Sequence, residues 1–420
     1  MTRPASSIFS SKLRHLGMLA AIAAVVLLGL FVMNRGMMRQ ESNELVGPFL
    51  EEGQSFDVLF FGSSHTICSI YPAQLWEENG IRAYNLGGHG QSMAASYWTM
   101  RMAAARHKPK IAVLDVYKVQ DSGAGMNRSY AHTSFDAYPL SAAKWQAVRG
   151  LYPGDTQAQA ELLFPLRLYH SRWDEFDSAM AYAALGRRGE PSAQLGAEIR
   201  YAITPFEEFT LVPQEEAILE DTAGVRYAMA FVDFCRENDI LPVLINLPCQ
   251  ASEEQQRAVN GLLAYAAEAG VETVNFQYLN LLDPDTDWQD GIDHVNLSGG
   301  RKLTAYLGQR LRALLPVEPE QEDPLWDDRA AASRAEIGDS IQRSGSLAES
   351  LLLLCRGGFT AELTLPGDAV MDTVTRKLAD QLGDRLTVYV DTQSGLCGLR
   401  VLDSAGEVIT EKQFSWQTVK

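Results

Sequence analysis

The sequence has little cysteine, and its cysteines follow no clustered pattern. Five of them are spread over 420 residues, and no two form a Cys-x-x-Cys pair. Small secreted domains held together by disulfides have a much denser pattern, so that class is excluded. Most of these thiols are expected to be buried and unreactive, with a disulfide between Cys355 and Cys397 as the alternative. No cofactor and no metal ion is expected.

Basic residues are also in short supply. The chain has 36 Lys and Arg against 53 Asp and Glu, which gives a formal net charge of −17. Nucleic acid binding depends on basic side chains that neutralise phosphates, so this balance argues against a nucleic acid partner. Any other anionic polymer would need a local basic patch that acts against the overall field of the protein.

Long hydrophobic runs are absent apart from one near the amino terminus. Residues 16–33 carry no charge, and a helix of this length comes close to the roughly 30 Å of a bilayer core. We predict a short cytoplasmic tail and a transmembrane anchor over residues 1–40. The run ends without a small-x-small cleavage site, so a retained anchor is favoured over a cleaved signal peptide. In both cases the body lies outside the cytoplasm, and the expected location is the cell membrane in a single-pass topology.

After this run, strand and helix patterns alternate. Short apolar runs typical of buried parallel strands occur at residues 57–61, 81–84, 111–116, 240–247 and 271–276. Amphipathic helical patterns lie between them, and the last covers residues 297–315. This order predicts an α/β domain over residues 41–316 with a largely parallel sheet and right-handed crossovers.

Three turns are expected at the carboxyl edge of that sheet, where open α/β sheets bind ligands. The first contains Ser63 and Ser64, and the second is a glycine-rich turn over residues 85–92. The third, residues 290–298, places His294 beside two carboxylates. Together they supply a nucleophile, a base, an orienting acid and backbone donors, which are the groups that acyl transfer needs. The alternative for the first turn is that both serines only cap it.

These three blocks resemble the SGNH (GDSL-like) hydrolase and acyltransferase superfamily. Residues 61–64, Phe-Gly-Ser-Ser, resemble its first block, Phe-Gly-Asp-Ser. Residues 85–92 resemble its second block, Asn-x-x-x-x-Gly-Asp-Ser/Thr, and His294 matches the base of its last block. The third block, Gly-x-Asn-Asp, is missing after the third strand. The resemblance covers about residues 55–315 and is specific only at the three blocks.

The resemblance implies a flavodoxin-like three-layer domain and assigns roles to single residues. Ser64 takes the nucleophile position and His294 the base position. The amides of Ser64 and Gly90 are expected to bind the oxyanion, with Asn85 as a further donor in place of the missing block. The usual acid lies three residues before the histidine, where this chain has glycine, so Asp290 and Asp293 both remain open.

Between about residues 117 and 221 the alternation lapses into a large insertion. One short segment of it, residues 164–173, concentrates aromatic, basic and histidine side chains. Paired arginine N–H groups can hold a phosphate or carboxylate, and aromatic rings can stack on a sugar. The residues predicted to bind substrate are His89, Tyr169, His170, Arg172 and Trp173. The alternative is a packed insertion whose arginines pair with nearby acids such as Asp174 and Glu175.

The carboxyl-terminal part begins with a change in composition. Residues 317–346 start with a charged, proline-bounded stretch and are predicted to be an acidic linker. Residues 347–420 have strand, helix and hairpin patterns and are predicted to form a separate small α+β domain, for which the sequence suggests no chemistry.

Three functions fit these observations. The first is a membrane-anchored serine acyltransferase or esterase that acts on a cell-envelope glycan or teichoic acid, with an integral membrane protein as a possible acyl donor. The second is a carbohydrate esterase that acts on external polymers. The third is a non-enzymatic adaptor for a membrane O-acyltransferase, which the missing third block favours. A retained anchor favours the first function over the second.

Overall fold

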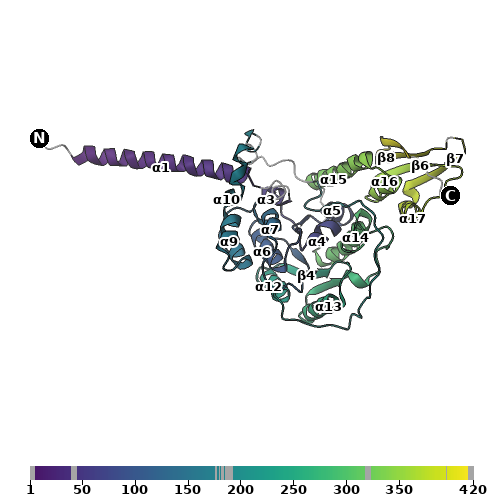
Figure 1. The fold of residues 1–420 in the computed structure, drawn as a ribbon, viewed down its shortest axis with the longest axis horizontal. Helices are drawn as coiled ribbons and strands as arrows, with labels where there is room; N and C mark the ends of the chain where they lie inside the picture. Colours follow the sequence, from purple (N-terminus) through teal and green to yellow (C-terminus); the bar gives the residue numbers. More distant parts are fainter. Residues whose placement is uncertain are drawn as a thin grey trace.

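The computed structural model describes residues 5–38, 45–175, 177–178, 180, 184, 193–316, 323–393 and 395–414. Within them, the chain forms a five-stranded parallel sheet and a four-stranded mixed sheet. A long apolar helix, α1 (Ala5–Gly36), projects from the body at one end of the molecule (Figure 1). The predicted α/β class with an amino-terminal apolar helix is confirmed at this level.

The parallel sheet forms the centre of the body. Its strands are β1 (Val58–Phe61), β2 (Ala83–Asn85), β3 (Ile111–Asp115), β4 (Leu241–Asn246) and β5 (Glu272–Asn275). Their spatial order, β2-β1-β3-β4-β5, is that of flavodoxin-like doubly wound folds. Each strand lies within about two residues of its predicted position. Because the strands are parallel, the loops that follow them all meet at one edge of the sheet.

Helices cover both faces of this sheet and make it three layers thick. One face packs against α6 (Met93–Ala104), α12 (Ala223–Glu237) and α13 (Glu253–Glu268), and the other against α5 (Pro72–Asn79) and α14 (Leu297–Leu314). Successive strand residues point to opposite faces. Leu59 and Phe61 therefore join the first core, while Val58 and Phe60 join the second.

Side-chain caps explain where several of these helices begin. The hydroxyl groups of Ser92, Thr222 and Ser252 each accept a hydrogen bond from the amide three residues later. The side chain of Asn296 accepts from the amides of Ser298 and Gly299 in the first turn of α14. Such caps satisfy amides that have no partner inside the helix. The last cap also fixes the end of the loop that carries His294.

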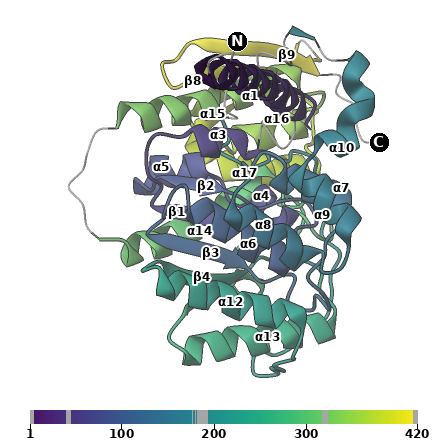
Figure 2. The same ribbon diagram turned by 90° about the vertical axis from the view of Figure 1, so that its left-hand side faces the viewer.

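The part of the insertion between residues 128 and 174 is mostly helical. It contains α7 (Arg128–Phe135), α8 (Ala142–Leu151), α9 (Thr156–Leu163), α10 (Leu166–Tyr169) and the 3-10 helix η1 (His170–Asp174). These helices pack around a core of their own that includes Phe135, Val148 and Leu162. Figure 2 shows α10 next to α1, which points toward the viewer there. Leu166 of α10 donates its backbone N–H to Asn34 of α1 at 2.7 Å.

The prediction of a linker over residues 317–346 is wrong for most of that range. Residues 324–343 form a helix, α15 (Pro324–Arg343), and only residues 317–322 lie outside the described part of the chain. Trp326 of α15 is fully buried, and its ring lies 6.0 Å from that of Phe56 and 5.9 Å from that of Trp76. Ile337 and Ile341 of the same helix are also buried, in the core of the carboxyl-terminal unit. The prediction was wrong because these few apolar side chains are spread through a charged sequence.

The carboxyl-terminal unit follows α15 and packs on the body. It contains α16 (Leu347–Leu354), β6 (Phe359–Pro366), α17 (Thr373–Leu382), the 3-10 turn η3 (Gly383–Arg385), β7 (Leu386–Asp391), β8 (Cys397–Asp403) and β9 (Val408–Phe414). The sheet order is β7-β6-β8-β9. Its core includes Tyr71 and Leu297 of the body, so this unit is not separate in its packing.

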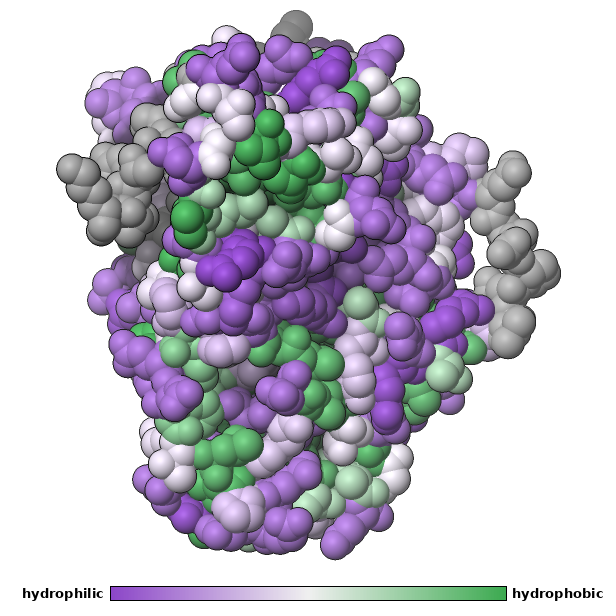
Figure 3. Space-filling view, turned by 90° about the vertical axis from the view of Figure 1, so that its right-hand side faces the viewer, coloured by the Kyte–Doolittle hydropathy of each residue, from purple (hydrophilic) through white to green (hydrophobic). Residues whose placement is uncertain are grey.

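Figure 3 shows apolar side chains gathered on the face of this unit, above a hydrophilic band.

The cysteines are all free. Each of the five is buried, including Cys355 and Cys397. The alternative of a disulfide between these two residues is therefore wrong, and the expectation of buried thiols is confirmed.

Candidate active site

Ser64 lies at the turn between β1 and a short helix, α4 (Ser64–Ser69). Ser63 caps this helix, since its side chain accepts a hydrogen bond from the His65 amide at 3.4 Å. The turn requires glycine at position 62, where φ is +152° and an added Cβ would lie 2.2 Å from Thr66 Oγ1. The side chain of Ser63 is therefore used as a helix cap, whereas that of Ser64 is partly exposed and can make other contacts.

Ser64 and His294 meet at this edge of the sheet. The distance between Ser64 Oγ and His294 Nε2 is 2.9 Å, although 230 positions separate the residues. The other ring nitrogen, Nδ1, lies 2.6 Å from Asp290 Oδ2. If Nδ1 carries the proton, it donates to Asp290, and Nε2 accepts from the Ser64 hydroxyl. A serine with a base and an orienting carboxylate in this order is the arrangement of a serine triad.

Of the two acids that the sequence left open, Asp290 is the one that holds the histidine. Its Oδ1 accepts hydrogen bonds from the amides of Ile292, Asp293 and His294 at 2.9–3.1 Å. Burial acts to raise the pKa of Asp290, but these bonds and the histidine ring together lower it to about 2. The carboxylate therefore stays ionised at any ordinary pH. Asp293 is half-buried, and burial raises its pKa.

The glycine-rich turn after β2 lies beside the Ser64 turn. Gly88 donates its backbone N–H to the carbonyl of Gly62 at 3.0 Å. Gly90 has a φ of +57°, and an added Cβ would lie 2.6 Å from the Tyr130 ring. Both conditions restrict this position to glycine. The structure thus brings the two turns together, while the oxyanion role of the Ser64 and Gly90 amides remains a prediction.

Asn85 does not fit the role predicted for it. Its side chain is completely buried, and Nδ2 donates to the carbonyls of Thr66 and Ile70 at 2.9 and 3.1 Å. Its Oδ1 accepts from the Gly87 amide. Since both amide hydrogens are used inside the fold, Asn85 cannot also donate to an oxyanion. The prediction is corrected: this residue ties the two turns together, which matters for their geometry.

Part of the site wall is formed by His65, which the sequence offers as a rival base next to the nucleophile, and by Tyr117, for which it predicts no role. The ring centroid of His65 lies 5.2 Å from that of His294 and 3.9 Å from that of Tyr117. Burial, followed by the charge of His294, lowers the pKa of His65 to about 3, so it stays neutral and serves as packing rather than as a rival base. Tyr117 directly follows the predicted strand 111–116. Its place at the carboxyl end of a parallel strand could have marked it as a residue of the site.

A cleft of about 730 Å³ with a mixed polar and apolar lining reaches the loop of His294 at Gln289, the neighbour of Asp290. His89, one of the predicted substrate-binding residues, is paired with Glu198 at 3.1 Å, and Glu198 is paired with Arg200 at 2.9 Å. The backbone carbonyl of Arg200 also accepts from Leu297 at the start of α14. The cleft is lined by residues of the insertion, of the carboxyl-terminal unit and of the His294 loop. Its polar residues are Glu198, Arg200, Tyr201, Gln289, Ser346 and Glu349, and its apolar residues include Ile199, Ile203 and Val374. No motif in the sequence marks these residues.

The other predicted substrate-binding residues lie elsewhere. Tyr169 is buried, and its hydroxyl donates to Asp136. Arg172 pairs with Glu175 and donates to the carbonyl of Met37 at the end of α1. His170 and Trp173 are exposed in the same segment, next to α1. For this segment the prediction of substrate binding is not supported, and the alternative of arginine pairing holds for Arg172.

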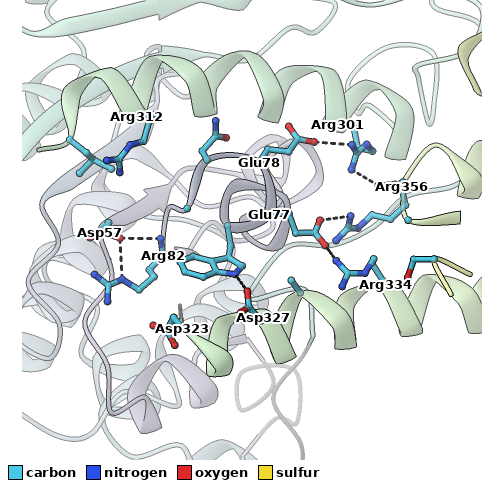
Figure 4. A pocket seen from close by; sticks show the side chains of 18 of the residues that line it. Asp57, Glu77, Glu78, Arg82, Arg301, Arg312, Asp323, Asp327, Arg334 and Arg356 are labelled. Carbon is cyan, nitrogen blue, oxygen red and sulfur yellow. Dashed lines mark hydrogen bonds and ion pairs between the residues drawn. The ribbon is translucent and has the colours of Figure 1, made fainter. Parts of the chain in front are cut away.

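A second cavity, of about 1070 Å³, opens at the opposite edge of the sheet. Its walls include Asp57 and Lys110, which directly precede β1 and β3, and Gly80, which lies three residues before β2. Figure 4 shows that its charged side chains largely neutralise one another, with Glu77 held by Arg334 and Arg356. These pairs tie α5 to the carboxyl-terminal unit and leave no concentrated charge for a ligand.

Comparison with known proteins adds no identification. No protein-family model matches the chain, and no curated protein matches it at a significant level. Within the described ranges, no group of three or more His, Cys, Asp and Glu side chains is arranged to hold a metal ion. The inference of function therefore depends on the site itself.

Proposed function

We propose that this protein is a membrane-anchored serine acyltransferase or esterase of the SGNH type. It acts on O-acyl groups of a cell-envelope glycan or teichoic acid. The observation that supports this most strongly is the chain of contacts from Ser64 through His294 to Asp290, at 2.9 and 2.6 Å. A vestigial adaptor would have no need to keep all three groups in register, so the contacts favour an enzyme over the adaptor alternative.

The chemistry follows the usual two-step course. His294 Nε2 takes the proton of the Ser64 hydroxyl while Oγ attacks the acyl carbonyl, and the donor alcohol leaves with that proton. The acyl group is then an ester on Ser64. An acceptor hydroxyl, or water, gives its proton to His294 and attacks this ester, which frees the serine. Asp290 holds the imidazole in the required tautomer throughout and stabilises the imidazolium.

The cleft supports a polymeric acceptor. It extends from Glu198, the partner of His89, to the carboxyl-terminal unit, and its lining combines amide, hydroxyl and carboxylate groups with apolar side chains. Polar groups in such a cleft can bind sugar hydroxyls, while the apolar side chains and Tyr201, which is nearly half exposed, can contact the rings. The apolar α1 helix is long enough to span a bilayer and keeps the body near the envelope surface.

The test is covalent labelling with a fluorophosphonate, followed by turnover of p-nitrophenyl acetate. Wild-type protein should be labelled on Ser64, and Ser64→Ala should lose labelling and turnover by a factor of roughly 10⁴ or more. Ser63→Ala is the matched control. It should cost about 1 kcal/mol of stability through the lost cap and retain both labelling and turnover. Unchanged turnover in Ser64→Ala would reject the proposal.

A further inference from the structure

The segment of residues 164–173 lies where α1 leaves its apolar stretch. The last turn of α1 contains Asn34, whose side chain accepts the backbone N–H of Leu166 at 2.7 Å. Arg172 donates to the carbonyl of Met37, one residue after α1 ends, at 3.0 Å. Residues 13–30 of α1 are exposed along their whole length, whereas Met37 is fully buried in the body. The segment is therefore fixed at the level where α1 changes from exposed to buried.

This segment exposes large apolar side chains at that level. Trp173 is 69% exposed, Phe164 is 56% exposed and Leu168 is 41% exposed. Arg167 is exposed beside them. Tryptophan and phenylalanine rings are favoured at the boundary between lipid headgroups and acyl chains, and nearby arginines can reach lipid phosphates. In water the same three side chains would have no partner to cover them.

We propose that the segment 164–173 is a membrane-contact surface whose partner is the lipid bilayer that holds α1. The inference depends on the membrane anchoring in the proposed function, but not on its chemistry. The bilayer is the occupant that the structure favours, because the segment is hydrogen-bonded to both ends of the junction between α1 and the body. A surface that enters the interface beside the anchor gives the body a second point of attachment. It restricts how far the body can tilt and keeps the catalytic edge in a defined orientation.

The depth of this segment can be measured on the full-length protein. Trp173→Cys is labelled with a nitroxide, and the protein is reconstituted into vesicles of phosphatidylcholine and phosphatidylglycerol. All five native cysteines are buried, so the introduced thiol is the reactive one. Val25→Cys, on the exposed side of α1, reports whether the anchor is inserted. Tyr389→Cys, an exposed aromatic position on β7 at the end of the molecule opposite α1, is the matched control (Figure 1).

We expect the label at position 173 to lie about 5–10 Å inside the headgroup boundary. It should be more accessible to oxygen and less accessible to a water-soluble nickel chelate than the label at 389. Equal nickel accessibility at 173 and 389, with the label at 25 in the bilayer core, would overturn the inference. Protection of position 173 from both reagents would overturn it too, because that result indicates a protein partner. If the label at 25 is in water, the anchor and this inference both fail, while turnover by Ser64 is unaffected.

Discussion

Two regions of the molecule differ in how well the sequence predicted them. One is the edge of the parallel sheet that carries Ser64 and His294, and the other is the segment 164–173. Both contain histidine, charged and polar side chains, and both were expected to form one substrate site. At the catalytic edge, Ser64 and His294 meet because each follows an element of a parallel sheet, and such a sheet brings its loops to one edge. The segment belongs to a helical insertion without that constraint, and it lies against α1. Topology, and not composition, decided which side chains meet.

After the loss of Ser64 itself, the largest effect should come from the acid that orients His294. Asp290→Asn keeps the size of the side chain but removes the charge that fixes the tautomer, so kcat should fall by a factor of roughly 10⁴. Asp293→Asn is the matched control, because the two ring nitrogens of His294 bond to Asp290 and Ser64 instead. Steady-state kinetics with p-nitrophenyl acetate measures both. Equal losses in the two variants would mean that the structure has identified the wrong acid.

A smaller loss is expected at the glycine turn. Gly90→Ala places a methyl group against Tyr130 at a φ of +57°, which should shift the turn and weaken an oxyanion donor, with a loss of about 10²-fold in kcat. Gly154→Ala has the same kind of backbone strain, at a φ of +81°, but an added Cβ meets nothing within 4 Å. It should lose some stability and keep its kcat. If Gly90→Ala turns over substrate at the wild-type rate, Gly90 has no part in the oxyanion site.

Asn85 offers a test of a structural role at the same edge. Asn85→Ala removes the side-chain donor to the buried carbonyls of Thr66 and Ile70, of which Thr66 keeps the Ile70 amide as a donor. Thermal or denaturant unfolding should therefore show a loss of about 1–3 kcal/mol. Any fall in kcat should be smaller than that of Gly90→Ala. A large loss of kcat with unchanged stability would restore the original assignment of Asn85 to the oxyanion site.

The smallest effect on turnover is expected from the segment 164–173. His170→Ala and Trp173→Ala change exposed side chains at the end of α1, so kcat/KM for a soluble ester should stay within about twofold of wild type, as for other surface changes. His89 pairs with Glu198 in the wall of the cleft, so His89→Ala is the matched comparison and should weaken the use of a glycan acceptor. A strong effect of Trp173→Ala on ester turnover would remove the contrast between the two regions.

The sequence was sufficient for the sheet and for the contact between Ser64 and His294, because short apolar runs and the turns after them follow from strand geometry. It could not choose between Asp290 and Asp293, since that choice depends on how three amides of one loop point at a carboxylate. It also missed α15, because the few apolar side chains that this helix buries, among them Trp326, Ile337 and Ile341, are spread through an otherwise charged sequence. Asn85 was misassigned because an asparagine side chain can donate hydrogen bonds equally well to a ligand and to buried backbone carbonyls.

Trp326 has a consequence for how the molecule melts. Its ring is fully buried against Phe56 and Trp76, and its indole N–H donates to Gln54. The carboxyl-terminal unit cannot come away from the body without exposing this ring and opening the core beneath it. Heating should therefore unfold both sheets in one cooperative transition. A chain that ends before α15 should be less soluble than the full-length protein.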